Sequence, residues 1–531
     1  MEETEENTVS EKTIEKRKLS LKKRCFGWIE DNYDTIFIAV FILAFILRIW
    51  IFFKTSTQPF WWDEADYLAA AKKWAGINPN LPDIWYYRRG FLWPLISSLF
   101  FRIGLGEIGM RFLVALFSSG IVVVSYFIIK KMFNKKAALL TALALSVSWV
   151  YLFFTGRVLT DIPAAFFILL ALLFFWKGYV LKEGNKFIYL FGLFFGIAVL
   201  IRMQSFIFVP PFLIYIFTKE KFKMFKNKHL WIALGILALL LVPQMIMYSS
   251  HYGNPIADVL GHYFGVKGLI PDSESAQRTV STLFDYFSNL PYILGGQYQL
   301  GIIIFILFLV GVFIFFFDFI LGFDKILKNE EIQKKFFILL WIVIPFLVLG
   351  YITEYVEHRY ISADLVFLFF LAIFPLMKLE DYISKKGKMS HKKAFTLIFI
   401  LVFILLIPNI TWGKELTESK ISSYAEVKEA GLWLKENSNL SDLIITSSTP
   451  QIIYYSERAV QSGNPVIWTN MSYFETEVNR LKPKYLMISA YEQSPEWLYI
   501  YPENNSDKLT PVKAFYQGQN PVVVIYEFNY S

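Results

Sequence analysis

Long apolar runs separated by short polar connections dominate the first four-fifths of the chain. Runs close to the ~20 residues that cross a bilayer as a helix recur eleven times. They lie at about 35–53, 108–129, 137–154, 162–180, 187–202, 204–218, 230–248, 299–320, 336–352, 360–377 and 394–411. A twelfth apolar piece, 91–103, contains Pro94 and is too short to span, so we predict an interfacial helix there. The pattern predicts an all-α polytopic membrane domain over 35–411.

The pattern changes after residue 411. KEAGLWLKEN has the spacing of an amphipathic helix, DLIITSS that of a buried strand, and PQIIYYSERA that of a second helix. KYLMISA and VVVIYEF are predicted as further strands. Alternating helix and strand patterns favour a small α/β layer domain over 412–531. Neither GxGxxG nor GxxxxGK[ST] occurs in it, which disfavours a nucleotide site.

The positions of lysine and arginine predict the orientation, because these residues collect in cytoplasmic connections. The basic segments 12–24, 130–136, 177–186, 219–228, 325–335 and 378–393 alternate as cytoplasmic loops should. The segment 1–34 is then cytoplasmic, the first span is a retained signal-anchor, and 412–531 is extracytoplasmic. N-x-S/T sequons, which need an outside location, occur only at Asn409, Asn439, Asn470, Asn504 and Asn529. We expect a multi-pass protein of the plasma membrane, or of the endoplasmic reticulum if the source is eukaryotic.

Composition excludes some other classes. Of 531 residues, 55% are hydrophobic and 19% aromatic, well outside the range of soluble domains. The formal charge of +8 comes from lysines between apolar runs, so we expect no nucleic-acid binding. A single cysteine, Cys25, rules out an intrachain disulfide.

One short stretch, WWDEADY at 61–67, places two adjacent carboxylates just beyond the first span. Tryptophan favours the headgroup level of a membrane, so Asp63 and Glu64 are predicted at the membrane–water boundary. The plain alternative is a solvated helix start, where acids favour the positive end of the helix dipole.

Other charged residues fall at the same predicted boundary, although charge near the membrane is costly and by default a sign of function. Arg88 and Arg89 follow the helix that is predicted to begin at Asp63 and Glu64. TGRVLTDIP carries Arg157 and Asp161, GIAVLIRMQSF carries Arg202, and EHRY carries His358, Arg359 and Tyr360. We predict that these segments converge on one pocket. For each arginine the alternative is snorkelling or a simple ion pair, such as Arg157 with Asp161 one helical turn away.

Acids together with several arginines suit a phosphorylated substrate at the membrane surface. Arginines bind phosphate through charge-assisted hydrogen bonds, and one acid can act as a general base. A polyprenyl-phosphate sugar fits, because its tail stays in the bilayer and its phosphate lies at headgroup depth. The sequence has no His/Cys cluster of the kind that binds a metal tightly, and we expect no other tightly bound cofactor. Binding of a divalent ion near Asp63 and Asp161 remains an open alternative.

The order of these motifs resembles the GT-C glycosyltransferases of the protein O-mannosyltransferase and aminoarabinose-lipid A transferase type. DEADY resembles their DE-x-x-Y motif, and RRGFLWP occupies the place of a basic helix with proline. GEIGMRFLVAL, RVLTDIPAAFF, GIAVLIRMQSFIFVPP and EHRY follow in the family's order. Where the family has two prolines in its interfacial helix, this chain has only Pro94. The C-terminal domain does not resemble the β-trefoil of eukaryotic protein mannosyltransferases. The resemblance covers about 35–380 and leaves the acceptor open.

The resemblance implies a hexosyltransferase that moves mannose or a similar sugar from a polyprenyl- or dolichyl-phosphate donor to a hydroxyl of a protein, glycan or glycolipid. It implies that Asp63 is the catalytic base and that Arg89, Arg202 and Arg359 hold the phosphate. Direct displacement by one base would invert the anomeric carbon, with Glu64 orienting the site and Tyr67 on the same helix face as Asp63.

Two other functions stay open. An oligosaccharyltransferase would carry WWDYG in its external C-terminal domain, whereas the only WWD of this chain is at 61–63. A lipid-sugar transporter or flippase would show paired half-sequences, and no convincing internal repeat is present.

Overall fold

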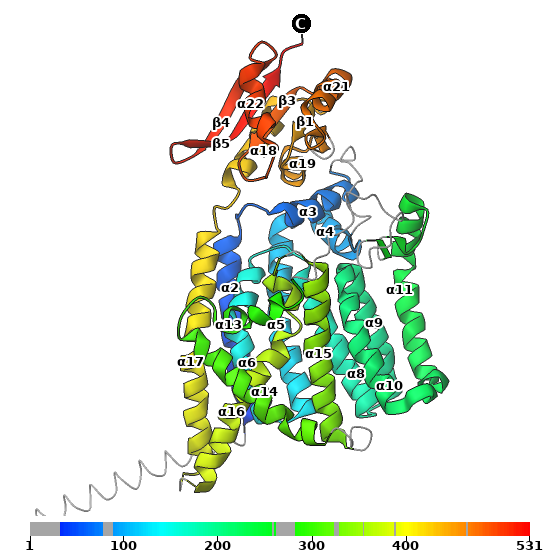
Figure 1. Ribbon diagram of the computed structural model, residues 1–531, viewed down its shortest axis with the longest axis vertical. Helices are drawn as coiled ribbons and strands as arrows, with labels where there is room; N and C mark the ends of the chain where they lie inside the picture. Colours follow the sequence, from blue (N-terminus) through cyan, green and yellow to red (C-terminus); the bar gives the residue numbers. More distant parts are fainter. Residues whose placement is uncertain are drawn as a thin grey trace, which may run out of the picture.

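The computed structural model describes residues 32–77, 89–257, 260–261, 282–322, 329–353, 355–386, 389–462 and 466–530. These residues form a tall helical bundle with a small α/β unit over one end (Figure 1). Arg88 and most of the predicted cytoplasmic segment 1–34 lie outside the described residues.

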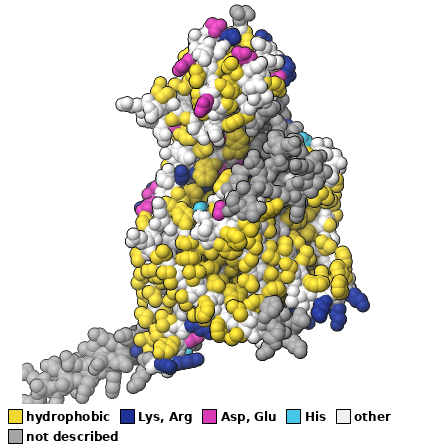
Figure 2. All heavy atoms as spheres, in the orientation of Figure 1, with side chains coloured by type: hydrophobic (Ala, Val, Ile, Leu, Met, Phe, Trp, Pro, Cys, Tyr) yellow, Lys and Arg dark blue, Asp and Glu magenta, His cyan; other side chains and the backbone are white. Residues whose placement is uncertain are grey.

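Long apolar helices form the bundle. They are α2 (Tyr33–Thr55), α5 (Gly106–Met132), α6 (Lys135–Val147), α7 (Trp149–Thr155), α8 (Asp161–Phe175) with the π-helical turn Trp176–Val180, α9 (Asn185–Ile201), α10 (Val209–Glu220), α11 (Lys228–Tyr252), α14 (Gly301–Leu321), α15 (Glu330–Ile352), α16 (Leu365–Lys386) and α17 (His391–Ser419). Figure 2 shows apolar side chains spread broadly over the face of the bundle in view, as expected of surface that faces lipid.

The predicted fold class, a helical multi-pass membrane domain with a small C-terminal α/β unit, is confirmed. Seven described helices are long and apolar enough to cross a membrane, or eight if α6 and α7 make one span. The predicted count of eleven stays a prediction, because α9 has only 17 residues and α10 only 12.

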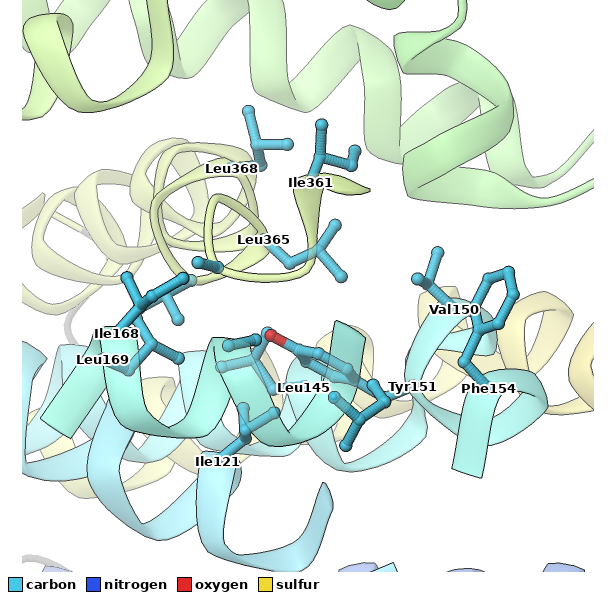
Figure 3. Packing of buried hydrophobic residues seen from close by; sticks show 14 of the residues in the cluster. Ile121, Leu145, Val150, Tyr151, Phe154, Ile168, Leu169, Ile361, Leu365 and Leu368 are labelled. Carbon is cyan, nitrogen blue, oxygen red and sulfur yellow. The ribbon is translucent and has the colours of Figure 1, made fainter. Parts of the chain in front are cut away.

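The core of the bundle lies where α8 packs against α5 and α9. Figure 3 shows Ile168 and Leu169 of α8, Leu145 of α6 and Leu365 of α16 facing one another within it. The hydroxyl of Tyr151 donates to the carbonyl of Ser362 at 2.5 Å. This bond ties α7 to the turn before α16, so the two loops that carry Arg157 and Arg359 are held against each other.

The bend of 48° between α6 and α7 has a specific partner. The backbone N–H of Trp149 donates to Oδ1 of Asn409 in α17 at 3.2 Å, and the Asn409 amide donates to the carbonyl of Leu294 at 2.9 Å. Asn409 is fully buried. Although it begins a sequon, it is therefore a packing residue and not a site for glycosylation.

Two helices lie across one end of the bundle, α3 (Trp62–Trp74) and α4 (Leu92–Arg102). The predicted interfacial segment 91–103 corresponds to α4. Eight consecutive side chains of α3, 64–71, are buried, since α4 covers one side of this helix and the C-terminal unit covers another.

The C-terminal unit contains a five-stranded sheet of order β2-β1-β3-β5-β4. Its elements are α18 (Ala425–Asn437), β1 (Leu443–Thr446), α19 (Thr449–Ser456), β2 (Ala459–Ser462), α21 (Met471–Leu481), β3 (Tyr485–Ser489), α22 (Glu496–Asn504), β4 (Leu509–Gln517) and β5 (Asn520–Phe528). β1 pairs in parallel with β2 and β3, and β5 runs antiparallel to β3 and β4. β2 and β4 were not predicted, because the first has four residues and the second is largely exposed.

The C-terminal unit is fastened to the segment around α3. The ammonium group of Lys72 pairs with Glu457 at 2.8 Å, and the hydroxyl of Tyr455 accepts from the backbone N–H of Phe60 at 2.9 Å. The amide of Gln58 donates to the carbonyl of Lys420 at 2.7 Å. The helix that carries Asp63 is therefore held between the bundle and the end of the chain.

Candidate active site

The start of α3 presents Asp63 to solvent and turns Glu64 inward. The carboxylate of Glu64 accepts from the backbone N–H of Trp61 at 2.8 Å, as the third residue of a capping box does. Asp63, in the same first turn, has a side chain that is 25% exposed. The two adjacent acids thus have different surroundings, and only Asp63 is open to a ligand.

Two arginines from distant segments hold the Asp63 carboxylate. Arg89 donates to Oδ1 at 2.9 Å and Arg359 pairs with Oδ2 at 3.2 Å. Burial alone would raise the pKa of Asp63, but the charges of Arg89 and Arg359 outweigh it and hold the pKa well below its ordinary value. The sequence left open which of these effects dominates; in this geometry the arginines do.

Arg359 also connects Asp63 to a second acid. Its Nε lies 4.0 Å from Oδ2 of Asp161, and Arg202 pairs with Oδ1 of Asp161 at 3.3 Å. Arg202 donates in addition to the hydroxyl of Thr160 at 3.0 Å, and its guanidinium lies 4.5 Å from the ring centroid of Tyr360. Five separate segments of the protein therefore contribute Arg89, Asp63, Arg359, Asp161 and Arg202 to one row of alternating charges, the charge chain.

Neither oxygen of Asp161 accepts a hydrogen bond from a described residue, although the side chain is almost fully buried. A buried carboxylate without hydrogen bonds is costly, and its two arginine contacts are long for charged pairs. The guanidinium groups near Asp161 are thus loosely held by it, with hydrogen-bonding capacity left for an anion.

Tyr67 and Asp66 complete the face of α3. The Tyr67 hydroxyl accepts from Arg89 at 3.1 Å and lies 3.4 Å from the hydroxyl of Thr160. Asp66 is buried, with Oδ2 at 3.7 Å from Nε of Arg89. The sequence analysis did not single out Asp66 or Thr160. A signal for Asp66 was present, because it follows Asp63 by three residues and so shares its helix face.

Arg157 and Glu64 form a separate buried pair. Arg157 lies 3.3 Å from the Glu64 carboxylate and stacks on the Trp61 ring at 3.7 Å, and Glu64 also accepts from the N–H of Val158 at 2.6 Å. The i,i+4 pair of Arg157 with Asp161 does not form. The contacts of Glu64 with Trp61, Arg157 and Val158 fix the loop that leads to Asp161.

The EHRY segment contributes its residues unequally. Arg359 and Tyr360 reach the charge chain, whereas His358 turns its ring toward Trp149 and Tyr292, at centroid distances of 5.4 and 4.9 Å. Burial lowers the pKa of His358 to about 4, so the ring is neutral at pH 7. Glu357 pairs with Arg359 at 3.1 Å, and burial raises its pKa against the opposing charge of Arg359.

The acids of this cluster do not meet as metal ligands do. Among the described residues, the acid and histidine atoms close enough to share an ion belong to Glu380, Asp381 and His391. These residues lie at the opposite end of α16 and the start of α17, where Lys136 already pairs with Glu380. At the candidate site, arginines separate Asp63 from Asp161.

The chain is similar to known proteins in part of its sequence and in its fold. Residues 88–248 match the family model for dolichyl-phosphate-mannose-protein mannosyltransferase. No curated protein is recognisably similar in sequence. ArnT from Cupriavidus metallidurans, bound to undecaprenyl phosphate, superposes with a TM-score of 0.60 at 13% identity, over 94% of this chain and 98% of that one.

An archaeal structure is similar to the same extent. The oligosaccharyltransferase AglB from Archaeoglobus fulgidus, in complex with an inhibitory peptide and a dolichol-phosphate, gives a TM-score of 0.58 at 15% identity, over 87% of this chain and 70% of that one. The same archaeal enzyme was also solved with zinc and sulfate. The fold is that of the GT-C glycosyltransferases.

The GT-C fold and the family match together confirm the class predicted from the sequence. The chain is a multi-pass membrane protein with the GT-C fold, and its residues 88–248 are similar to a mannosyltransferase family. The matched region contains four of the motifs in order, RRGFLWP, GEIGMRFLVAL, RVLTDIPAAFF and GIAVLIRMQSFIFVPP.

Proposed function

We propose that this GT-C enzyme transfers one sugar from a polyprenyl- or dolichyl-phosphate donor to a hydroxyl acceptor on the outer face of the membrane, with inversion. The observation that carries the proposal is the chain Arg89–Asp63–Arg359–Asp161–Arg202 at the boundary of the apolar belt. It offers three cations to a phosphate and one partly exposed carboxylate to an acceptor.

In this proposal Arg89, Arg202 and Arg359 bind the donor phosphate. Each belongs to a different loop and keeps only part of its hydrogen-bonding capacity engaged with acids. Guanidinium groups bind phosphate oxygens in pairs. A phosphate ester is a stabilised leaving group, so a general acid is not needed for its departure.

Asp63 is the proposed general base. The acceptor hydroxyl loses its proton to the Asp63 carboxylate as its oxygen bonds to the anomeric carbon, and the bond from that carbon to the phosphate oxygen breaks. In the free enzyme Asp63 is a weak base, because Arg89 and Arg359 stabilise its charge. Donor phosphate that draws Arg359 toward itself weakens this stabilisation and makes Asp63 a stronger base once the donor is bound.

The remaining predicted residues position the phosphate-binding arginines and the base Asp63. We propose that Glu64 and Arg157 position the loop before Asp161, that Tyr67 orients Arg89, and that Tyr360 places the guanidinium of Arg202. Their side chains lie beside the charge chain. His358, packed between aromatic rings, supports Arg359 by position rather than by charge.

The donor is proposed as a monophosphate and the sugar as mannose or a similar hexose. The sugar follows from the name of the matching family model. Undecaprenyl phosphate bound to ArnT and dolichol-phosphate bound to AglB support a polyprenyl carrier. The archaeal enzyme was also solved with zinc, and in a second version of the proposal Asp63 and Asp161 would hold a divalent ion that would neutralise charge on the donor phosphate.

The domain boundaries and the orientation are part of the proposal. We propose a cytoplasmic segment 1–34, a transferase domain 35–411 and an extracytoplasmic domain 412–531. The basic hairpins lie at the end of the bundle away from α3, which supports this orientation (Figure 2).

A transfer assay with the purified protein tests the proposal. Polyprenyl-phosphate mannose, a polyprenyl-pyrophosphate glycan, and both peptide and glycolipid acceptors are supplied separately, and the anomeric configuration of any product is determined. Inverted product from the monophosphate donor is expected. Product from the pyrophosphate donor alone would establish the oligosaccharyltransferase alternative, and a retained configuration would refute the mechanism.

A further inference from the structure

An apolar cavity lies at the end of the bundle opposite to the charge chain. It has a volume of about 260 Å³, close to the lower end of the ~300–1,000 Å³ typical of small-molecule sites. All of its lining residues are apolar, and they come from α9, α10, α11 and the 3₁₀ turn Lys221–Lys226. Nothing in the proposed transfer reaction uses this cavity.

The cavity keeps its shape through two contacts. Gly192 of α9 allows close approach of α11, since a Cβ there would lie 2.3 Å from the carbonyl oxygen of Ala233. At the mouth, the indole N–H of Trp231 donates to the carbonyl of Phe225 at 2.8 Å. The helices therefore meet at the inner wall while their outer faces stay open to lipid.

A cluster of positive charge surrounds the mouth of this cavity. The basic hairpin, residues 219–228, contains five lysines and one acid. Lys221, Lys223, Lys226 and Lys228 are exposed. Figure 2 shows dark blue side chains gathered at this corner of the molecule, at the tip between α10 and α11. The aromatic rings of Phe222 and Phe225 are 75% and 55% exposed beside them, as in a segment that rests on a membrane surface.

We propose that this cavity and the basic hairpin form a binding site for an anionic phospholipid, separate from the donor site. One acyl chain fills the cavity between α9, α10 and α11, and the headgroup phosphate lies among the hairpin lysines. Charge complementarity selects the headgroup, because juxtamembrane lysines attract anionic lipids. The apolar lining selects a hydrocarbon chain over a polar ligand.

The tail of the polyprenyl donor is the competing occupant. Its phosphate belongs at the other end of the bundle, beside Arg202, while the cavity is lined by the half of α9 that starts at Asn185. A carrier tail in the cavity would leave the lysines without a phosphate partner. The phospholipid accounts for both features with one molecule.

Native mass spectrometry of the delipidated full-length protein tests the site. Phosphatidylglycerol and phosphatidylcholine with identical acyl chains are offered together, and we expect at least fivefold preferential retention of phosphatidylglycerol. The double variant Lys223→Gln/Lys226→Gln should remove the preference, and Leu213→Trp, which fills the cavity, should reduce retention of both lipids.

Matched controls separate the site from general effects. The exposed pair Lys385→Gln/Lys386→Gln on α16 and the exposed Leu239→Trp on α11 should leave retention unchanged. Equal retention of the two lipids by the wild type, or equal loss in the control variants, would overturn the proposal. Displacement of phosphatidylglycerol by an equimolar amount of undecaprenyl phosphate would assign the cavity to the carrier tail instead.

Discussion

Replacing Arg359 by glutamine should separate the two functions proposed for this residue. Arg359 lies 3.2 Å from Asp63 and 4.0 Å from Asp161, so among the described residues it is the side chain that pairs with both acids. A hydrogen bond to a charged group contributes about 1.5–3 kcal/mol, which corresponds to a donor affinity lower by about 10- to 150-fold. Glutamine keeps the size and one donor but removes the charge.

The same change should alter the pH dependence in a defined direction. An opposite charge within hydrogen-bonding distance lowers a carboxyl pKa by about 1–3 units, so loss of Arg359 raises the pKa of Asp63. Arg89 remains, and the pKa stays below that of a free carboxyl group. A base acts only when deprotonated, and the acid limb of kcat/KM should therefore move to higher pH in Arg359→Gln.

Donor binding to purified protein in nanodiscs and initial transfer rates from about pH 2 to 8, a range that extends down toward the lowered pKa of Asp63, measure both effects. Arg359→Lys, which keeps the charge but not the two-pronged geometry, should restore much of the pH profile and less of the affinity. Arg480→Gln, at an exposed pair in α21, is the matched control. Unchanged donor affinity in a folded Arg359→Gln would refute the phosphate assignment, and an unmoved acid limb would refute its coupling to Asp63.

Three further predictions concern the base, the buried pair and the orientation. Asp63→Asn should lower kcat by ~10²–10⁴ with little change in donor binding; full turnover would exclude Asp63 as the base. Glu64→Ala leaves Arg157 as an uncompensated buried charge and should lower the free energy of unfolding by about 3–5 kcal/mol, measured by denaturant titration; a change below about 1 kcal/mol would contradict the structural role. In a cysteine-free background, cysteines at the exposed positions Ser472 and Lys223 should be labelled from opposite sides of the membrane, and labelling from one side would reverse the proposed topology.

Much of the fold was predictable because membrane helices and their lengths follow from hydrophobicity alone. α2, α5 and α11 begin and end close to the predicted runs. The bend at Ser148 was not predictable, since it depends on Asn409, which is 260 residues away in sequence. Strand β4 was missed because its exposed, polar side chains lack the pattern of a buried strand.

The candidate site was predictable as a list of residues but not as an arrangement. Motif order predicted that Asp63, Arg202 and Arg359 converge, and the structure places the three side chains in one cluster. Sequence spacing favoured Arg157 as a partner of Asp161, whereas the folded chain pairs it with Glu64. Which acid partners which arginine depends on the loop conformations after Trp61 and Thr160, and these are set by tertiary contacts.

The attachment of α3 to the C-terminal unit bears on how the enzyme is made. Phe60 and Tyr455 are separated by 395 residues, and Lys72 and Glu457 by 385. The segment that carries Asp63 leaves the ribosome 385 to 395 residues before its contacts Tyr455 and Glu457 do. The segment around Asp63 therefore acquires these contacts only after residues 455–457 have been synthesised, so a chain truncated before residue 455 would lack them.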